Sequence, residues 1–154
     1  MSLPSLGPRG EGWLILQLLL LALVALAGLA SPAAWSGPLV SITSLLGLGL
    51  MLGGAMLLGR GLMDLGRNLT SLPRPRDDAH LVESGVYSLV RHPIYGGLVL
   101  TAIGWALVAA SLLTVGLGLF FDLKSRREEA WLQDRYEGYA AYMTRTRRLL
   151  PWVY

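Results

Sequence analysis

The chain has 154 residues, of which 53% are hydrophobic, and its mean hydropathy is +0.51. A soluble domain of this length is more polar, so the composition indicates an integral membrane protein. The formal charge of +3 does not indicate a nucleic-acid partner, because basic loop residues orient membrane helices and meet anionic lipid heads. Cysteine is absent and the only histidines are His80 and His92, which excludes disulfides and argues against a metal centre.

The first half of the chain contains a long uncharged segment. No charged residue lies in the 48 residues from Gly12 to Gly59, and one membrane-spanning helix needs about 20. We predict one span over Trp13 to Ala30 and a second over Leu39 to Gly59 that continues as helix toward Leu65. The alternative for the first span is a signal peptide, whose apolar region is usually shorter, about 7–15 residues. Within the second span, the Gly49-Leu-Met-Leu-Gly53 spacing predicts a face for close helix packing.

The second half alternates between charged and uncharged segments. Charges and prolines predict a loop over residues 66–92, and the 28 residues from Ile94 to Phe121 are uncharged. As one helix these 28 residues would be about 42 Å long, against a hydrocarbon core of about 30 Å. They form either one strongly tilted span or a hairpin of two short helices that turns near Ala110-Ser111. The hairpin places all 13 Lys and Arg residues on one side of the membrane, as the positive-inside tendency favours.

These patterns predict an all-α integral membrane protein with about four transmembrane helices. We expect a C-terminal helical hairpin, an interfacial amphipathic helix, a multi-pass location in the inner or cell membrane, and both termini in the cytoplasm. The chain is interpreted as a single membrane domain with three parts. These are a two-span scaffold (1–65), a cytoplasmic loop (66–92), and a hairpin with a C-terminal helix that forms the functional site (93–154).

The tail, from about Ser125 to Arg147, is predicted to form the amphipathic helix. Its apolar and aromatic residues repeat at helical spacing and form one stripe. The stripe consists of Leu132, Tyr136, Tyr139 and Met143. Aromatic residues beside basic ones suit the membrane–water interface, so we interpret the tyrosines as interface residues.

Ionisable residues gather where the predicted hairpin begins and ends. The hairpin returns the chain to the surface it left, so Arg91 and His92 become neighbours of Lys124 to Glu129. Ionisable groups at membrane depth are functional candidates. Arg91 and His92 either help the helix that starts at Pro93 to hold an anion, or anchor it in the head groups. Adjacent glutamates on a helix point about 100° apart, so only one of Glu128 and Glu129 faces a given site and the other orients a loop or bonds backbone.

Three segments resemble a known enzyme family. They are LVESGVYSLVRHPIYGG (81–97), KSRREEAWL (124–132) and YAAYMTRTRRLLP (139–151). Together they resemble the isoprenylcysteine carboxyl methyltransferase family and its bacterial relatives, with phospholipid N-methyltransferases as a neighbouring group. The resemblance covers the C-terminal half, from Leu81 to Pro151, and implies a membrane enzyme that uses S-adenosyl-L-methionine.

The resemblance also implies roles for individual residues. The cofactor-binding candidates are Ala79, His80, Leu81, Val82, Tyr87, His92, Pro93, Ile94, Tyr95 and Glu128, to which we add the neighbouring Glu129. The catalytic candidates are Lys124, from the resemblance, and Arg91, from its place at the mouth of the predicted hairpin. The family's acceptor-facing arginine falls at Lys124 in this chain, and lysine keeps the charge but lacks the planar fork that matches a carboxylate.

Several functions remain open at this point. The expected acceptor is a lipophilic or lipid-modified molecule that enters from the bilayer, and its reacting group is a carboxylate or a lipid amine. A second enzymatic hypothesis is an NADPH-dependent membrane reductase of the sterol-reductase type. A third hypothesis is a small helical bundle that scaffolds partners without catalysis. Binding of S-adenosylhomocysteine or NADPH discriminates among the three.

Overall fold

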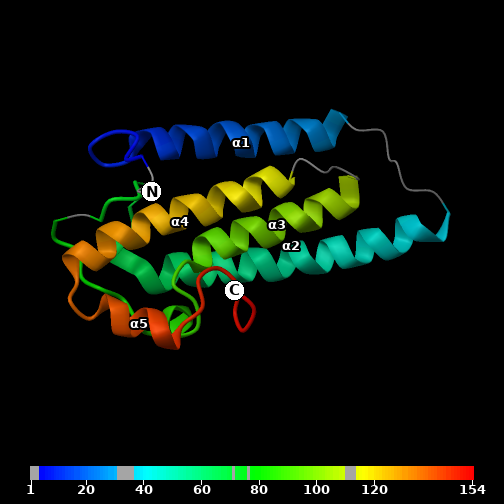
Figure 1. Ribbon diagram of the computed structural model, residues 1–154. Coiled ribbons are helices and arrows are strands. Elements are labelled where there is room, and N and C mark those ends of the chain that lie inside the picture. The colour runs from blue at the N-terminus through cyan, green and yellow to red at the C-terminus, as the bar shows by residue number, and fades with distance from the viewer. Residues whose placement is uncertain (1–3, 31–36, 71, 76, 110–113) are drawn as a thin grey trace.

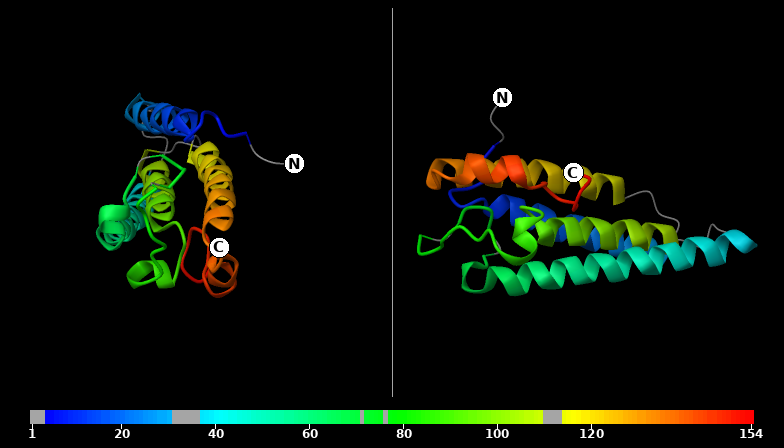
Figure 2. Two further views of the ribbon diagram at one scale, coloured as in Figure 1. Left: turned by 90° about the vertical axis from the view of Figure 1, so that its left-hand side faces the viewer. Right: turned by 90° about the horizontal axis from the view of Figure 1, so that it is seen from below.

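A computed structural model describes residues 4–30, 37–70, 72–75, 77–109 and 114–154 of the chain. Within these ranges the regular structure is helical and no β-strand is formed, which confirms the all-α prediction. The α-helices are α1 (Glu11–Ala30), α2 (Pro38–Leu65), α3 (Pro93–Ala109), α4 (Thr114–Arg135) and α5 (Tyr139–Arg145), with 3-10 turns at Gly66–Asn68 and Gly85–Ser88. The four longer helices run side by side, and α5 lies at the end where α4 finishes (Figures 1 and 2).

Helices α1 and α2 expose apolar side chains along their length. Both are long and apolar enough to cross a membrane, and only 17% and 11% of their most apolar windows are buried in the molecule. The core helix of a soluble protein would be mostly buried. Leu19 is 62% exposed and Leu45 is 72% exposed, as expected for side chains in lipid. The exposed apolar surface of both helices therefore supports the prediction of a membrane protein. The bounds of the two helices agree closely with the two predicted spans.

Glycines form the contact between α2 and α3. A Cβ atom at Gly54 would lie 2.7 Å from the carbonyl oxygen of Gly97, and one at Gly47 would lie 2.6 Å from that of Gly104. Both distances are shorter than a real Cβ contact, so the two backbones approach as closely as only glycine permits. The seven-residue spacing on each helix keeps these glycines on one face.

The glycine pair predicted for helix packing is not the one that packs. Nothing lies within 4 Å of a Cβ atom built on Gly49 or Gly53. Gly49 follows Gly47 by two positions and Gly53 precedes Gly54 by one, so both point away from the face that meets α3. The prediction identified the right helix and the wrong face.

Helices α3 and α4 pack against each other and against α1. Trp13 of α1 contacts Phe120 of α4 with ring centroids 5.7 Å apart, and Leu117, Phe121 and Ala102 complete this core. Helix α3 ends at Ala109 and α4 begins at Thr114, so the turn predicted near Ala110-Ser111 lies outside the described residues.

The tail is not one continuous helix, contrary to the prediction for residues 125–147. Helix α4 ends at Arg135 and α5 starts at Tyr139, after Gly138, which has low helix propensity. The break turns α5 back onto the bundle. As a result Tyr139 is 1% exposed and Tyr142 is 2% exposed, so the interpretation of Tyr139 as an interface residue is wrong.

The segment after α5 fixes the start of α3. The backbone N–H groups of Arg91 and His92 donate to the carbonyl oxygens of Arg147 and Arg148 at 2.8 and 2.9 Å. Pro93 then begins α3, as predicted, because its fixed φ and missing N–H suit a first helical position. The two side chains before Pro93 are thus held between the tail and α4.

Candidate active site

A cavity of about 380 Å³ lies at the end of the bundle that carries α5. Apolar side chains of α1 and α2, the loop before α3, and polar side chains of α3 and α4 line it. Five of the chain's six tyrosines contribute to its wall, namely Tyr87, Tyr95, Tyr136, Tyr139 and Tyr142. The volume falls within the range of about 300–1,000 Å³ that small-molecule sites occupy.

Glu128 is the carboxylate that faces the cavity. Its Oε2 atom accepts a hydrogen bond of 2.8 Å from the Tyr95 hydroxyl and lies 3.9 Å from His92 Nδ1. Burial raises the pKa of Glu128, and His92, Tyr95 and Lys124 offset only part of this effect. A carboxylate in this position is an acceptor for hydroxyl or ammonium groups of a ligand.

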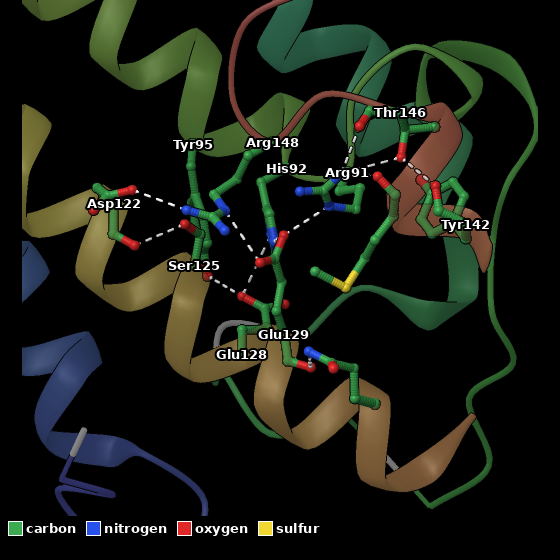
Figure 3. Close-up of polar contacts among 12 residues, drawn as sticks. Arg91, His92, Tyr95, Asp122, Ser125, Glu128, Glu129, Tyr142, Thr146 and Arg148 are labelled. Atoms are coloured by element: carbon green, nitrogen blue, oxygen red, sulfur yellow. Dashed lines mark hydrogen bonds and ion pairs between the residues drawn. The ribbon is translucent and has the colours of Figure 1, made fainter. Parts of the chain in front are cut away.

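Glu129 projects about 100° away from Glu128 around α4 and is 2% exposed. Its two oxygens accept from Arg91 Nε at 2.7 Å and from Arg148 Nε at 3.1 Å (Figure 3). Burial alone would raise the pKa of Glu129, but His92 and Arg91 more than offset it and lower the pKa to about 2. The two adjacent glutamates therefore face different surroundings, as their angular separation on a helix requires.

Arg91 and Arg148 extend this cluster across three segments of the chain. The Nη1 atom of Arg91 donates to the carbonyl oxygen of Thr146 at 2.6 Å, at the end of α5. Arg148 also donates to Asp122 at 3.2 Å, nearer the surface (Figure 3). The cluster ties α4, the start of α3 and the tail together, and so fixes the position of His92 against Glu128.

Lys124 lies one helical turn before Glu128 and is 1% exposed. Its ammonium group donates a hydrogen bond to the Oε1 atom of Gln17 on α1. The same Nζ atom lies 5.0 Å from the centre of the Tyr95 ring, close enough for a cation–π contact. Lys124 therefore faces the cavity from the side formed by α1.

The loop before α3 closes another side of the cavity. Ala79 accepts a hydrogen bond of 2.9 Å from the Tyr136 hydroxyl, and the backbone N–H of His80 donates to Asn68 at 3.0 Å. The buried Tyr87 donates to the carbonyl oxygen of Gly61 at 3.2 Å. These bonds attach the loop to α2 and to the turn before α5.

Comparisons with known proteins add to this geometry. The family model for phospholipid methyltransferase matches residues 42–138, which is more than half of the chain. The chain belongs to the phospholipid methyltransferase family. Protein-S-isoprenylcysteine O-methyltransferase B from Arabidopsis thaliana is 29% identical over 115 residues, which cover 70% of this chain. The matched part spans 58% of that relative's length. No solved structure matches the chain.

The family assignment confirms the resemblance noted in the C-terminal half. Most residues that the resemblance implicates gather on one cavity, although they come from three separate segments. The residues on its wall are Ala79, His80, Leu81, Val82, Tyr87, Arg91, His92, Ile94, Tyr95, Lys124 and Glu128. Two others lie off the wall: Pro93 packs against Gly61, and Glu129 is engaged with arginines.

Sequence reasoning missed two groups of cavity residues. Gln17, with Leu14 and Leu18, brings α1 into a site that the resemblance confined to the C-terminal half. Gln17 interrupts an apolar run, and a polar residue inside a membrane span was the available signal. Tyr139 and Tyr142 were visible as a spaced tyrosine pair, but their inward direction depends on the break before α5.

Proposed function

We propose that this protein is a membrane methyltransferase that uses S-adenosyl-L-methionine to methylate a lipophilic acceptor. The observation that carries the proposal is the convergence of family-implicated residues on one cavity. Loop residues 79–82, the start of α3 and Glu128 of α4 are far apart in sequence and share its wall. Family membership and the named Arabidopsis relative support the same reaction class.

The residues present fit this cofactor. Glu128 accepts hydrogen bonds, as a ribose or an amino group requires, and the tyrosine rings offer faces to a nucleobase or a sulfonium cation. The Tyr139 hydroxyl oxygen is a buried polar atom without a hydrogen-bond partner among the described residues. Such atoms are expected where a protein is shaped for a polar ligand.

When bound, S-adenosylmethionine supplies an electrophilic methyl group. The protein then mainly has to position the two reactants and exclude water. We assign cofactor binding to Glu128, His92 and the loop at 79–82. We assign acceptor positioning to Lys124, which lies beside the apolar side chains of α1. A carboxylate acceptor needs no base, whereas an ammonium acceptor first has to lose a proton.

We assign Arg91 a positioning role. Its guanidinium group donates to Glu129 and to the carbonyl oxygens of Met143 and Thr146. These bonds hold the end of α5 and the residue before His92, so Arg91 acts through the shape of the site. The catalytic role predicted for Arg91 would require the guanidinium group to leave these partners.

Ligand binding to the purified protein in detergent tests the proposed function. We expect S-adenosylhomocysteine to raise the thermal midpoint, because a ligand at 100 times its Kd adds about 2.7 kcal/mol to stability. NADPH at the same concentration should leave the midpoint unchanged. A shift with NADPH alone would favour the reductase hypothesis, and no response to either ligand would favour a non-enzymatic bundle.

We further propose four spans with both termini and the 66–92 loop in the cytoplasm. The start of α1, the end of α2, the start of α3 and the end of α4 lie at the same end of the bundle (Figure 1). Arg9 precedes α1, Arg60 lies in the last two turns of α2, and Arg91 comes shortly before α3, so these three charges belong to that end. Their common placement agrees with the positive-inside tendency.

Single cysteines in this cysteine-free chain test the topology. We expect an impermeant maleimide to label Leu39→Cys and Gly116→Cys from outside the cell and Glu137→Cys only in inverted vesicles. Leu39 is 55% exposed, and a Cβ atom at Gly116 meets nothing within 4 Å, so both changes are tolerated sterically. Labelling of Gly116→Cys from the same side as Glu137→Cys would contradict the hairpin.

A further inference from the structure

The five tyrosines on the cavity wall differ in what their hydroxyl groups do. Four of them donate hydrogen bonds to protein oxygens. The pairs are Tyr87 with the Gly61 carbonyl at 3.2 Å, Tyr95 with Glu128 at 2.8 Å, Tyr136 with the Ala79 carbonyl at 2.9 Å, and Tyr142 with the Tyr87 carbonyl at 2.5 Å. The Tyr139 hydroxyl has no partner among the described residues, although its residue is 1% exposed.

The position of Tyr139 is fixed by the fold. It is the first residue of α5, its backbone N–H donates to the carbonyl oxygen of Tyr136 at 3.0 Å, and its ring packs edge-on against Tyr142 at 5.6 Å. A buried hydroxyl without a partner is costly, so it is uncommon unless it serves a ligand or a mechanism.

The electrostatic surroundings keep this phenol protonated. Burial, and then the charges of Glu129 and Glu128, raise the pKa of Tyr139 well above its ordinary value. At neutral pH the group is therefore a neutral O–H, able to donate one hydrogen bond and accept others. Tyr139 and Glu128 both line the cavity.

We propose that the Tyr139 hydroxyl binds the cofactor, through a polar atom that S-adenosylmethionine shares with S-adenosylhomocysteine. This inference rests on the proposed function. Tyr139 begins the resembling segment 139–151, to which the resemblance assigns no cofactor-binding role, and it adds α5 to the segments that hold the cofactor. The break before α5 then has a functional consequence, because a continuous helix would not bury this side chain in the cavity.

Two Tyr→Phe substitutions test the inference. Tyr139→Phe keeps the ring and removes the hydroxyl. We expect it to weaken S-adenosylhomocysteine binding by about five- to fifteenfold, the effect of one hydrogen bond to a ligand. Its thermal midpoint without ligand should stay the same or rise, because no protein hydrogen bond is lost. Calorimetry and thermal unfolding in detergent measure the two quantities.

The matched control is Tyr154→Phe, at the one tyrosine outside the cavity wall. The Tyr154 hydroxyl donates to Asp122 at 2.7 Å. This variant should therefore have a lower thermal midpoint in the absence of ligand and bind S-adenosylhomocysteine with wild-type affinity. If Tyr139→Phe bound S-adenosylhomocysteine with wild-type affinity, or lowered the thermal midpoint as much as the control does, this inference would be overturned. The proposed function would still stand. Absence of binding to the wild-type protein would overturn the proposed function, and this inference with it.

Discussion

Glu129→Ala is expected to lower the free energy of unfolding by about 3–5 kcal/mol, the cost of removing one partner from a buried ion cluster. The side chain of Glu129 is 3% exposed and binds Arg91 and Arg148 through different oxygens. Without it, the Arg91 guanidinium, whose side chain is 7% exposed, loses its countercharge in a buried position. Unfolding in mixed detergent micelles, followed by circular dichroism, measures the loss.

The control for this variant is Glu137→Ala. Glu137 is an exposed carboxylate on the turn between α4 and α5, so its removal should change stability by less than about 0.5 kcal/mol. Equal, small effects for the two variants would contradict the structural role of the Glu129 cluster.

Acid provides an independent measurement on the same group. The pKa of Glu129 is lowered in the folded state from an ordinary value of 4.5 to about 2. A carboxyl with a lowered pKa stabilises the fold above its ordinary value and loses that contribution as the pH falls through the folded value. Wild-type stability should therefore fall between about pH 4.5 and pH 2, and Glu129→Ala should show a smaller fall in this window.

The second large effect distinguishes the roles of Glu128 and Lys124, the two polar residues of α4 that face the cavity. Glu128→Gln should weaken S-adenosylhomocysteine binding by about 1.5–3 kcal/mol, because a hydrogen bond to a charged group is lost. Lys124→Ala should keep wild-type cofactor affinity and slow methyl transfer by about 10²-fold, because it removes positioning of the acceptor. Lys124→Arg should retain activity, and increase it if the acceptor is a carboxylate, since the planar fork returns.

Two measurements per variant decide this division of roles: cofactor affinity by calorimetry and the rate of methyl transfer in membranes. Equal loss of affinity in Glu128→Gln and Lys124→Ala, with unchanged turnover, would contradict it. A simple ion pair between the two residues is a weaker explanation of their spacing, because the Lys124 ammonium donates to Gln17 on another helix.

Local signals in the sequence predicted the helices well where polarity and proline mark their ends. The uncharged run placed α1 and α2 to within a few residues, and Pro93 marked the start of α3. The tail was harder, because the stripe from Leu132 to Met143 fits one continuous helix. Gly138 disfavours a helix only modestly. The break between α4 and α5 therefore depends on the packing of Tyr139 and Tyr142 against the bundle.

The periodicity of the sequence could not predict contacts between segments that are far apart along the chain. The hydrogen bond between Gln17 and Lys124 joins residues 107 positions apart, and no local pattern links them. The same limit applies to the glycines of α2. Gly49 and Gly53 have the spacing of a known packing motif, but α3 contacts the face of Gly47 and Gly54, which only the arrangement of the two helices determines.

The central claim, that this cavity carries out methyl transfer in the membrane, is tested most directly by following a labelled methyl group. Membranes containing the wild-type protein or Glu128→Gln are incubated with methyl-labelled S-adenosylmethionine and extracted with organic solvent. We predict label in the lipid-extractable fraction with the wild-type protein and a large loss with Glu128→Gln. Label no higher than in membranes without the protein, or equal label with both proteins, would contradict it.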